Sequence, residues 1–223
     1  MPGKSNIQNE FAVRLHSLAA AVVGLLCVGF FSASYVDAAD SAGANDRYAL
    51  RSGMNEFGVW AGGSPGNSQI IGKVEDRQLL LFALRYGRIL STWEFLALEY
   101  TFDIFPAAVY FEPSDVRRGS STIYGAGLSP IGFKLNFAPQ SWIQPFFAAS
   151  VGFLYFMHDV PVPDSSRFNF TPELGVGLQF FFAPKRALTL GYKLHHISNA
   201  NTGESNPGMD SHVIYAGISF FTP

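Results

Sequence analysis

A short segment near the C-terminus, residues 192–215, holds three side chains that together could cleave an ester. His196 and Ser198 lie two positions apart, and Asp210 follows after a stretch rich in Asn, Gly and Pro. A serine hydroxyl becomes a nucleophile when a histidine takes its proton and a carboxylate orients that histidine. An isolated His-x-Ser pattern is more often structural, here two polar residues at a membrane rim. The combination with Asp210 favours the catalytic interpretation, provided that the three side chains share a face.

Strand alternation places the three side chains on one face, because successive side chains of a strand point to opposite sides. The apolar face of the first strand of this hairpin continues into His196 and Ser198, and that of the second strand continues back to Asp210. These apolar faces consist of Leu188, Leu190, Tyr192 and Leu194 in the first strand and Ile214, Ala216, Ile218 and Phe220 in the second. The three polar residues are therefore predicted on an otherwise apolar surface.

The pairing of the two strands decides how these side chains meet. A hairpin that is symmetric about Glu204 puts Ser198 opposite Asp210. His196 is then diagonal to Asp210, at a backbone separation of about 7–8 Å that longer side chains bridge. A nucleophile, a base and an orienting acid can therefore converge in this hairpin.

The same hairpin resembles that of a known enzyme family. The stretch His196-Ile197-Ser198-Asn199-Ala200-Asn201, followed by Asn206-Pro207-Gly208 and an aromatic-rich last strand, is similar to the active-site hairpin of the outer-membrane lipid A 3-O-deacylases, the PagL family. This resemblance implies an eight-stranded barrel that removes an ester-linked acyl chain from lipid A.

The resemblance also implies roles for individual residues. His196 is the base, Ser198 the nucleophile and Asn199 a contributor to the oxyanion hole. The family's acid is a glutamate, and the matching position here is the shorter Asp210, with Glu204 in the loop as the alternative acid. No metal or cofactor is indicated, because two histidines and one carboxylate here lack the spacing of a ligand set.

The amino-acid composition indicates which kind of secondary structure positions these residues. Charged residues make up 14% of the 223-residue chain and hydrophobic residues 48%, with 22 phenylalanines, whereas soluble domains carry about 25% charged residues. Outside the N-terminus, no apolar run reaches the roughly 18 residues that a membrane helix needs. Apolar composition without long apolar runs is typical of a membrane β-barrel. A soluble β-sandwich or barrel is the alternative that composition alone leaves open.

Eight strand-like segments follow residue 55, separated by turn-forming stretches. They cover residues 56–63, 77–90, 92–112, 121–137, 143–157, 167–182, 186–198 and 210–221. An even count is typical of single-chain bacterial barrels. The sixth segment alternates most clearly, with apolar residues at the even positions from Phe168 to Phe180 and small or polar residues, such as Glu173, at the odd positions. The sequence therefore predicts an all-β fold, an eight-stranded antiparallel transmembrane β-barrel.

Four charged residues of the strands are predicted inside the barrel. Glu99, Asp103 and Glu173 lie on the faces opposite the apolar ones, and Arg85 is a candidate partner. Buried carboxylates need partners, so we interpret these residues as a structural charge network of the lumen and not as catalytic groups.

Residues 1–39 have the features of a signal peptide. Positive charges precede an apolar run over residues 18–31, and small residues follow it. The only cysteine, Cys27, lies in this segment, so the mature chain is expected to have no thiol chemistry. Residues 40–223 form the predicted barrel hydrolase domain, which opens with a mobile lead-in over 40–55.

The predicted protein is thus a serine esterase of the bacterial outer membrane. Its substrate is lipid A of lipopolysaccharide in the outer leaflet, and the loop over 199–209 is on the extracellular side. The net charge of −2 and the lack of a basic stripe do not indicate nucleic-acid binding. Both a monomer and a homodimer are compatible with the sequence. Two other functions are a non-enzymatic barrel for adhesion or membrane stability and an outer-membrane phospholipase-type esterase, which a calcium requirement would indicate.

Overall fold

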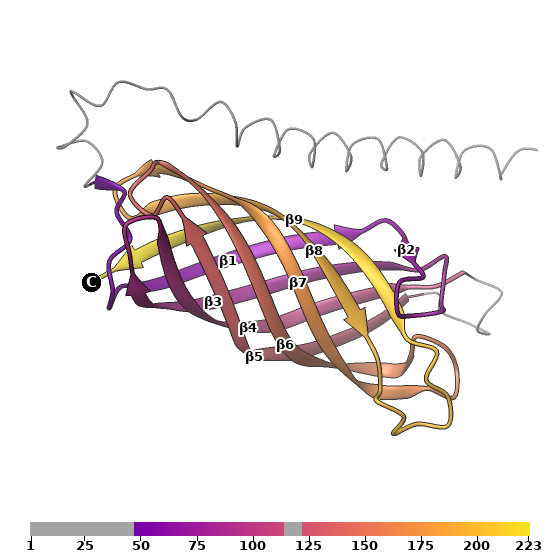
Figure 1. Ribbon diagram of the computed structural model, residues 1–223. Helices are drawn as coiled ribbons and strands as arrows, with labels where there is room; N and C mark the ends of the chain where they lie inside the picture. The colour runs from indigo at the N-terminus through magenta and orange to yellow at the C-terminus, as the bar shows by residue number, and fades with distance from the viewer. Residues whose placement is uncertain (1–46, 114–121) are drawn as a thin grey trace, which may run out of the picture. The chain divides into compact units, whose positions relative to one another are not determined.

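A single antiparallel sheet forms the part of the chain that the computed structural model describes, residues 47–113 and 122–223 (Figure 1). Its strands are β1 (Asn55–Ser64), β2 (Asn67–Ser68), β3 (Gln78–Thr92), β4 (Leu96–Phe111), β5 (Thr122–Phe137), β6 (Ile143–Val160), β7 (Ser166–Ala183), β8 (Arg186–Ile197) and β9 (Met209–Thr222). The predicted signal peptide and Cys27 lie outside the described residues. Within the two described ranges, no helix is long and apolar enough to cross a membrane.

The sheet closes on itself. Each long strand pairs with the next long strand along the chain, and β9 returns to pair with β1. Closure leaves no edge strand with unpaired backbone groups, which is the condition for a sheet to span lipid. The predicted eight-stranded antiparallel β-barrel is thereby confirmed. We call the end that holds Asn55 and Thr222 the terminal end, and the opposite end, where β2 lies, the loop end (Figure 1).

The alternation of the strands separates an apolar outer wall from a polar lumen. In β7, Phe170 and Leu174 point outward and are 44% and 54% exposed, while Thr171 and Glu173 between them are buried. The same pattern recurs around the barrel, and the exposed apolar side chains include Phe57, Val59, Leu80, Phe82, Leu84, Ile104, Phe133, Val151, Leu188, Leu190 and Phe220. This outward apolar belt is the surface that a membrane barrel presents to acyl chains.

Paired charges fill the middle of the lumen. Lys134 Nζ lies 2.7 Å from a carboxylate oxygen of Glu56 and 2.8 Å from one of Glu99. The guanidinium of Arg85 donates two hydrogen bonds to Asp103, at 2.8 and 2.7 Å. The predicted inward positions of Glu99 and Asp103 and the predicted partner Arg85 are therefore those of the structure. Buried ions of both signs compensate one another here, as burial requires.

Glu173 forms a second lumenal group closer to the loop end. Its carboxylate accepts hydrogen bonds from Lys193 Nζ at 2.9 Å and Ser150 Oγ at 2.7 Å, and lies 2.6 Å from His195 Nδ1. His195 is fully buried. Each carboxylate of the two lumenal groups thus lies against at least one basic side chain.

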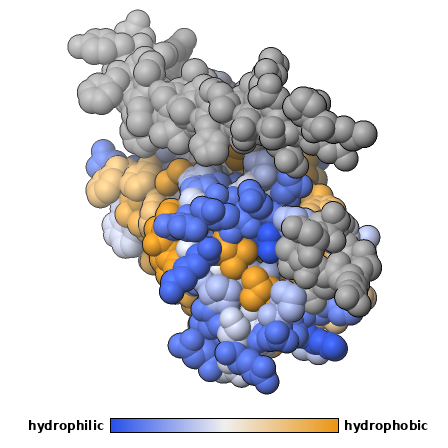
Figure 2. All heavy atoms as spheres, turned by 90° about the vertical axis from the view of Figure 1, so that its right-hand side faces the viewer, coloured by the Kyte–Doolittle hydropathy of each residue, from blue (hydrophilic) through white to orange (hydrophobic). Residues whose placement is uncertain are grey.

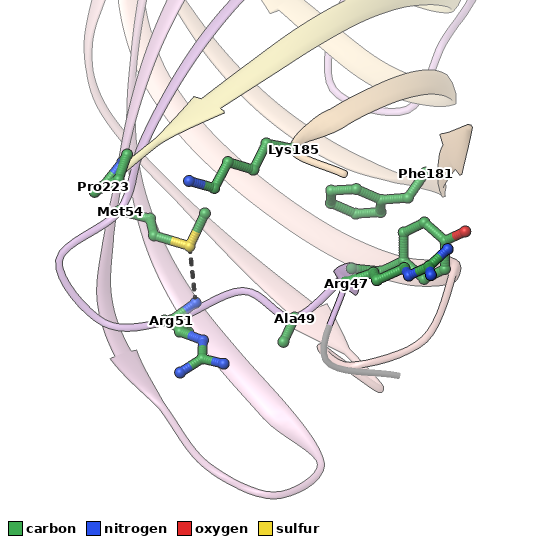
Figure 3. Close-up of a pocket in the computed structure, with 8 residues that line it drawn as sticks. Arg47, Ala49, Arg51, Met54, Phe181, Lys185 and Pro223 are labelled. Carbon is green, nitrogen blue, oxygen red and sulfur yellow. Dashed lines mark hydrogen bonds between the residues drawn. The ribbon is translucent and has the colours of Figure 1, made fainter. Parts of the chain in front are cut away.

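An apolar cluster closes the lumen at the end that holds the first described residues. At the terminal end, Leu50 and Met54 pack with Phe181 and Phe221, and Leu50 N donates to Pro139 O at 2.8 Å. Residues 47–54 thus dock at this end, around a hollow that Figure 3 shows. The expectation of a mobile lead-in over 40–55 is wrong for its last part because its apolar side chains complete this cluster; residues 40–46 lie outside the described part.

Candidate active site

The final hairpin brings His196 and Asp210 directly together. They are opposite each other in the β8–β9 ladder, whose last pair is Ile197 with Met209. The predicted pairing of Ser198 with Asp210 is therefore wrong by two residues. Ser198 instead leaves β9 and bridges to Phe170 of β7, with backbone hydrogen bonds of 2.7 and 3.1 Å. A shift of two preserves the face, so His196 and Ser198 still point outward.

The Asp210 carboxylate orients the ring of His196. Oδ1 lies 2.6 Å from His196 Nδ1. The His196 side chain is 13% exposed, whereas that of Asp210 is fully buried. This geometry fixes the ring and leaves Nε2 as the nitrogen that can exchange a proton with a substrate, as in a catalytic triad.

The first loop of the barrel buries Asp210 from outside. Three consecutive backbone N–H groups, of Ile70, Ile71 and Gly72, donate to Asp210 Oδ2 at 2.9, 2.6 and 2.8 Å. The loop reaches this position because β2 continues the line of β1 along β9, with Ser68 opposite Asp210. Convergent backbone amides form a concavity that holds an anion. This contact could not be predicted from the residue types, because backbone donors have no residue signature.

The Ser198 hydroxyl is hydrogen-bonded to the loop that follows it and not to His196. Its Oγ donates to Asn206 Oδ1 at 3.1 Å and accepts from the N–H of Ala200 at 3.2 Å. Both Ser198 and His196 are partly exposed on the outer wall, two positions apart along the chain. A Ser–His hydrogen bond therefore requires the Ser198 hydroxyl to leave its present partner, Asn206.

Asn199 organises the loop beside the serine. Its buried side chain donates from Nδ2 to Ser205 O at 2.8 Å and accepts from the N–H of Asn201 at 2.9 Å. The backbone N–H of Asn199 donates to Asn206 Oδ1 at 3.1 Å. The amide oxygen of Asn206 therefore accepts from both the hydroxyl of Ser198, the predicted nucleophile, and the backbone N–H of Asn199, the residue predicted to contribute to the oxyanion hole.

The remaining predicted acid lies elsewhere. Glu204 is exposed in the loop, and the carboxylate that His196 contacts is that of Asp210. Gly208, from the Asn-Pro-Gly motif, has a φ of +64°, and a Cβ there would lie 3.1 Å from His196 Cε1. The motif thus turns the chain into β9 without covering the imidazole.

Comparison with known proteins identifies the family. The family model described as lipid A 3-O-deacylase (PagL) matches residues 83–219, more than half of the chain. The chain belongs to the PagL family. It is thereby assigned to hydrolases that act on lipid A and to the bacterial outer membrane. No curated protein sequence matches the chain.

Solved structures similar to this PagL-family chain are small outer-membrane proteins. The crystal structure of the outer membrane enzyme PagL is 21% identical, covers 74% of this chain and 97% of its own, and has a TM-score of 0.46. Neisserial surface protein A is 16% identical, with coverage of 76% and 97% and a TM-score of 0.45. Ail of Yersinia pestis is 15% identical, with coverage of 77% and 99% and a TM-score of 0.45.

Polar and apolar surfaces meet at the end of the barrel that holds the PagL-family hairpin. Figure 2 looks onto the loop end, where hydrophilic residues predominate, with hydrophobic residues gathered on the wall beside it. Within residues 47–113 and 122–223, no three His, Cys, Asp or Glu side chains are grouped as metal ligands. The hollow of Figure 3 lies at the terminal end and includes none of the residues near His196.

Sequence reasoning missed a second polar chain on the same wall. His212 lies between Tyr192 and Ser68, with Nδ1 2.5 Å from the tyrosine Oη and Nε2 2.7 Å from the serine Oγ. Alternation alone could place Tyr192 and His212 on the outer face. Ser68 arrives from a distant loop, and only the folded β2–β9 pairing reveals it.

Proposed function

We propose that this protein is a serine esterase that removes the 3-O-linked acyl chain of lipid A, with Ser198 as nucleophile, His196 as base and Asp210 as orienting acid. The single observation that supports this most is the His196–Asp210 contact of 2.6 Å on the outward face of a barrel from the PagL family. A histidine oriented by a buried carboxylate, two residues from a serine, is the arrangement that serine esterases need.

The reaction starts with a change of partner for the serine. Substrate binding draws Asn206 Oδ1 away, and the Ser198 hydroxyl turns towards His196 Nε2. As the serine oxygen attacks the ester carbonyl carbon, Nε2 takes its proton and Asp210 stabilises the resulting imidazolium. The backbone N–H of Asn199, freed from Asn206, donates to the oxyanion.

Collapse of the tetrahedral intermediate completes the first half. The bond between the former carbonyl carbon and the sugar oxygen breaks. His196 returns the proton to that oxygen, which leaves as a sugar hydroxyl. Water then attacks the acyl-serine with His196 again as base, releasing the fatty acid and restoring Ser198. Atoms balance with water as the only co-reactant, and the protein's own groups move every proton.

The position of the hairpin along the barrel agrees with this substrate. His196 and Asp210 lie near the loop ends of β8 and β9, above the apolar belt that includes Leu188 and Leu190. We propose that the loop end faces the cell exterior and that the termini are periplasmic. The site then lies at the boundary between headgroups and acyl chains of the outer leaflet, where the ester bonds of lipid A are located.

Mass spectrometry of lipid A tests the proposal. Cells that produce the wild-type protein should lose one ester-linked acyl chain from lipid A, without added calcium. Ser198→Ala and His196→Ala should each lower the rate at least about 10³-fold, and the double variant should be scarcely worse, because groups of one catalytic unit are not additive.

Heat-dependent migration in SDS gels verifies that each variant barrel is folded. Ser52→Ala, which removes a hydroxyl at the terminal end that bonds to Leu90 O, is the matched control and should keep the wild-type rate. Deacylation by Ser198→Ala at the normal rate would refute the esterase assignment in favour of a non-enzymatic barrel. A strict calcium requirement would instead favour the phospholipase-type esterase.

A further inference from the structure

The Tyr192–His212–Ser68 chain lies on the outer wall, and the proposed reaction does not use it. Both ring nitrogens of His212 have partners, at 2.5 Å and 2.7 Å. The rings of Tyr192 and His212 also stack, with centroids 5.9 Å apart and an interplanar angle of 24°. All three side chains are partly exposed, so a lipid beside the barrel can reach them.

The directions of these two hydrogen bonds leave one of the two hydroxyl groups, that of Ser68 or of Tyr192, able to donate to a ligand. A neutral imidazole donates from one nitrogen and accepts at the other. If Tyr192 donates to Nδ1, then Nε2 donates to Ser68, and the serine hydrogen has no acceptor among these three side chains. If Ser68 donates to Nε2, the tyrosine hydrogen is the one not used. In both directions one hydroxyl can donate to an oxygen of a bound molecule.

The chain adjoins the proposed catalytic pair. His212 is paired with Leu194, and Asp210 is paired with His196. The two histidines are therefore diagonal neighbours on one face, about 7–8 Å apart at the backbone. Ser68 is itself opposite Asp210. One glycolipid molecule can span both groups.

Apolar side chains surround this polar chain. Ile70 and Ile71 in the first loop are 60% and 68% exposed. Leu190 and Ile214, on the same two strands as Tyr192 and His212, are 47% and 37% exposed. Polar groups on a lipid-facing wall are costly unless they have polar partners. Such a polar spot in an apolar wall fits a ligand with oxygen atoms next to acyl chains.

Binding explains the Ser68–His212 pair better than a second catalytic role does. The N–H groups of Ile70, Ile71 and Gly72, which follow Ser68 along the chain, all donate to Asp210. These three amides are therefore not available to stabilise an oxyanion at Ser68. The partner of His212 Nδ1 is a phenol and not a carboxylate.

We propose that Ser68, His212 and Tyr192 bind a headgroup oxygen of the same lipid A molecule whose ester lies at Ser198, and that they set the preference for a sugar-linked ester. This inference rests on the proposed function. The shared chemistry of the ligand is an oxygen acceptor, supplied by a sugar hydroxyl or by a phosphate.

Kinetics with two esters test this subsite. The refolded full-length barrel in detergent micelles is assayed with lipid A and with p-nitrophenyl decanoate, which has no sugar. Ser68→Ala, Tyr192→Phe and His212→Phe should each lower the ratio of kcat/KM for lipid A to that for the decanoate, by about five- to tenfold for one lost hydrogen bond. The loss should lie mainly in KM. Tyr124→Phe, an outward tyrosine on β5 that is 55% exposed, should keep the wild-type ratio.

Opposite results overturn the inference. An unchanged ratio in all three variants refutes the subsite, and so does an equal fall of kcat for both esters, since that indicates a loosened first loop. Repeating the assay with lipid A that lacks one phosphate distinguishes the two ligand sources. If the variants then differ less from wild type, the oxygen belongs to that phosphate; an undiminished difference assigns it to the remaining headgroup.

A binding measurement separates this inference from the proposed function. Native mass spectrometry of Ser198→Ala in micelles should detect bound lipid A whether or not the protein hydrolyses it. Adding His212→Phe should reduce the bound fraction about five- to tenfold, whereas adding Tyr124→Phe should leave it as it was. If wild type hydrolyses neither ester, the proposed function fails, and a loss of binding on His212→Phe still supports the subsite. Equal binding with and without His212→Phe overturns it.

Discussion

At the scale of single residues, both oxygens of the Asp210 carboxylate accept hydrogen bonds. One oxygen meets His196 at 2.6 Å, and the other accepts three amides of the first loop. The resemblance to the PagL family suggests a glutamate here. The aspartate fits because strand pairing places it directly opposite His196, without the diagonal reach that a symmetric hairpin would need.

Two substitutions of Asp210 should therefore both lower activity. Asp210→Asn should reduce kcat on lipid A about 10²- to 10⁴-fold, because the ring loses its orienting charge and its preferred tautomer. Asp210→Glu should reduce kcat about tenfold or more, because an added methylene in an enclosed site displaces either the first loop or the imidazole, and a displacement of about 1 Å can cost 10²-fold. Steady-state rates on lipid A micelles measure both. A wild-type rate for Asp210→Glu would show that the loop yields easily.

The shared face of the candidate site residues could be predicted from the sequence, but their contacts could not. Alternation put His196, Ser198 and Asp210 on one face because the period of a strand is two. The register differed because Ser198 follows β7 rather than β9 at the barrel rim. Asn206 as the partner of the Ser198 hydroxyl depends on loop geometry, which no periodicity encodes.

At the scale of elements, the first loop is a part of the site. The strands themselves were predicted to within a few residues, since apolar alternation and turn residues mark them. β2 was not predicted, because Gly62-Gly63-Ser64-Pro65-Gly66-Asn67 has the composition of a turn and its two-residue ladder exists only through pairing with β9. The loop positions Asp210, the proposed catalytic acid, with backbone atoms.

Removing one backbone donor of this loop should therefore impair catalysis. Ile71→Pro removes the N–H that lies 2.6 Å from Asp210 Oδ2, and proline has no donor to replace it. We expect kcat on lipid A to fall about tenfold or more, in line with the roughly 1.5–3 kcal/mol of a hydrogen bond to a charged group. Ile71→Ala keeps the amide and should lose much less. Equal rates for the two variants would exclude a positioning role for this amide.

At the scale of the whole molecule, the barrel wall separates two histidine–carboxylate pairs that are neighbours in sequence. His196 faces outward and contacts Asp210, while His195 faces inward and contacts Glu173, both at 2.6 Å. The two pairs have the same local geometry. Only the closed barrel, which the alternation of the strands predicted, tells the outer pair from the inner one.

Substitutions in the inward pair should therefore lower the stability of the barrel, whereas the matched substitution of the outward histidine should lower activity. Glu173→Gln leaves Lys193 without its counter-charge in the lumen, and breaking such a buried pair costs about 3–5 kcal/mol. Glu173→Gln and His195→Asn should both lower the urea midpoint of the refolded barrel, followed by tryptophan fluorescence. The fraction that remains folded should still deacylate lipid A at the wild-type kcat, because neither side chain reaches the lipid. His196→Asn should lose activity with a much smaller shift of the midpoint, since His196 is partly exposed at the rim. If Glu173→Gln abolished hydrolysis in a barrel of normal stability, the inward pair would belong to the catalytic machinery, and the division of roles by the wall would be wrong.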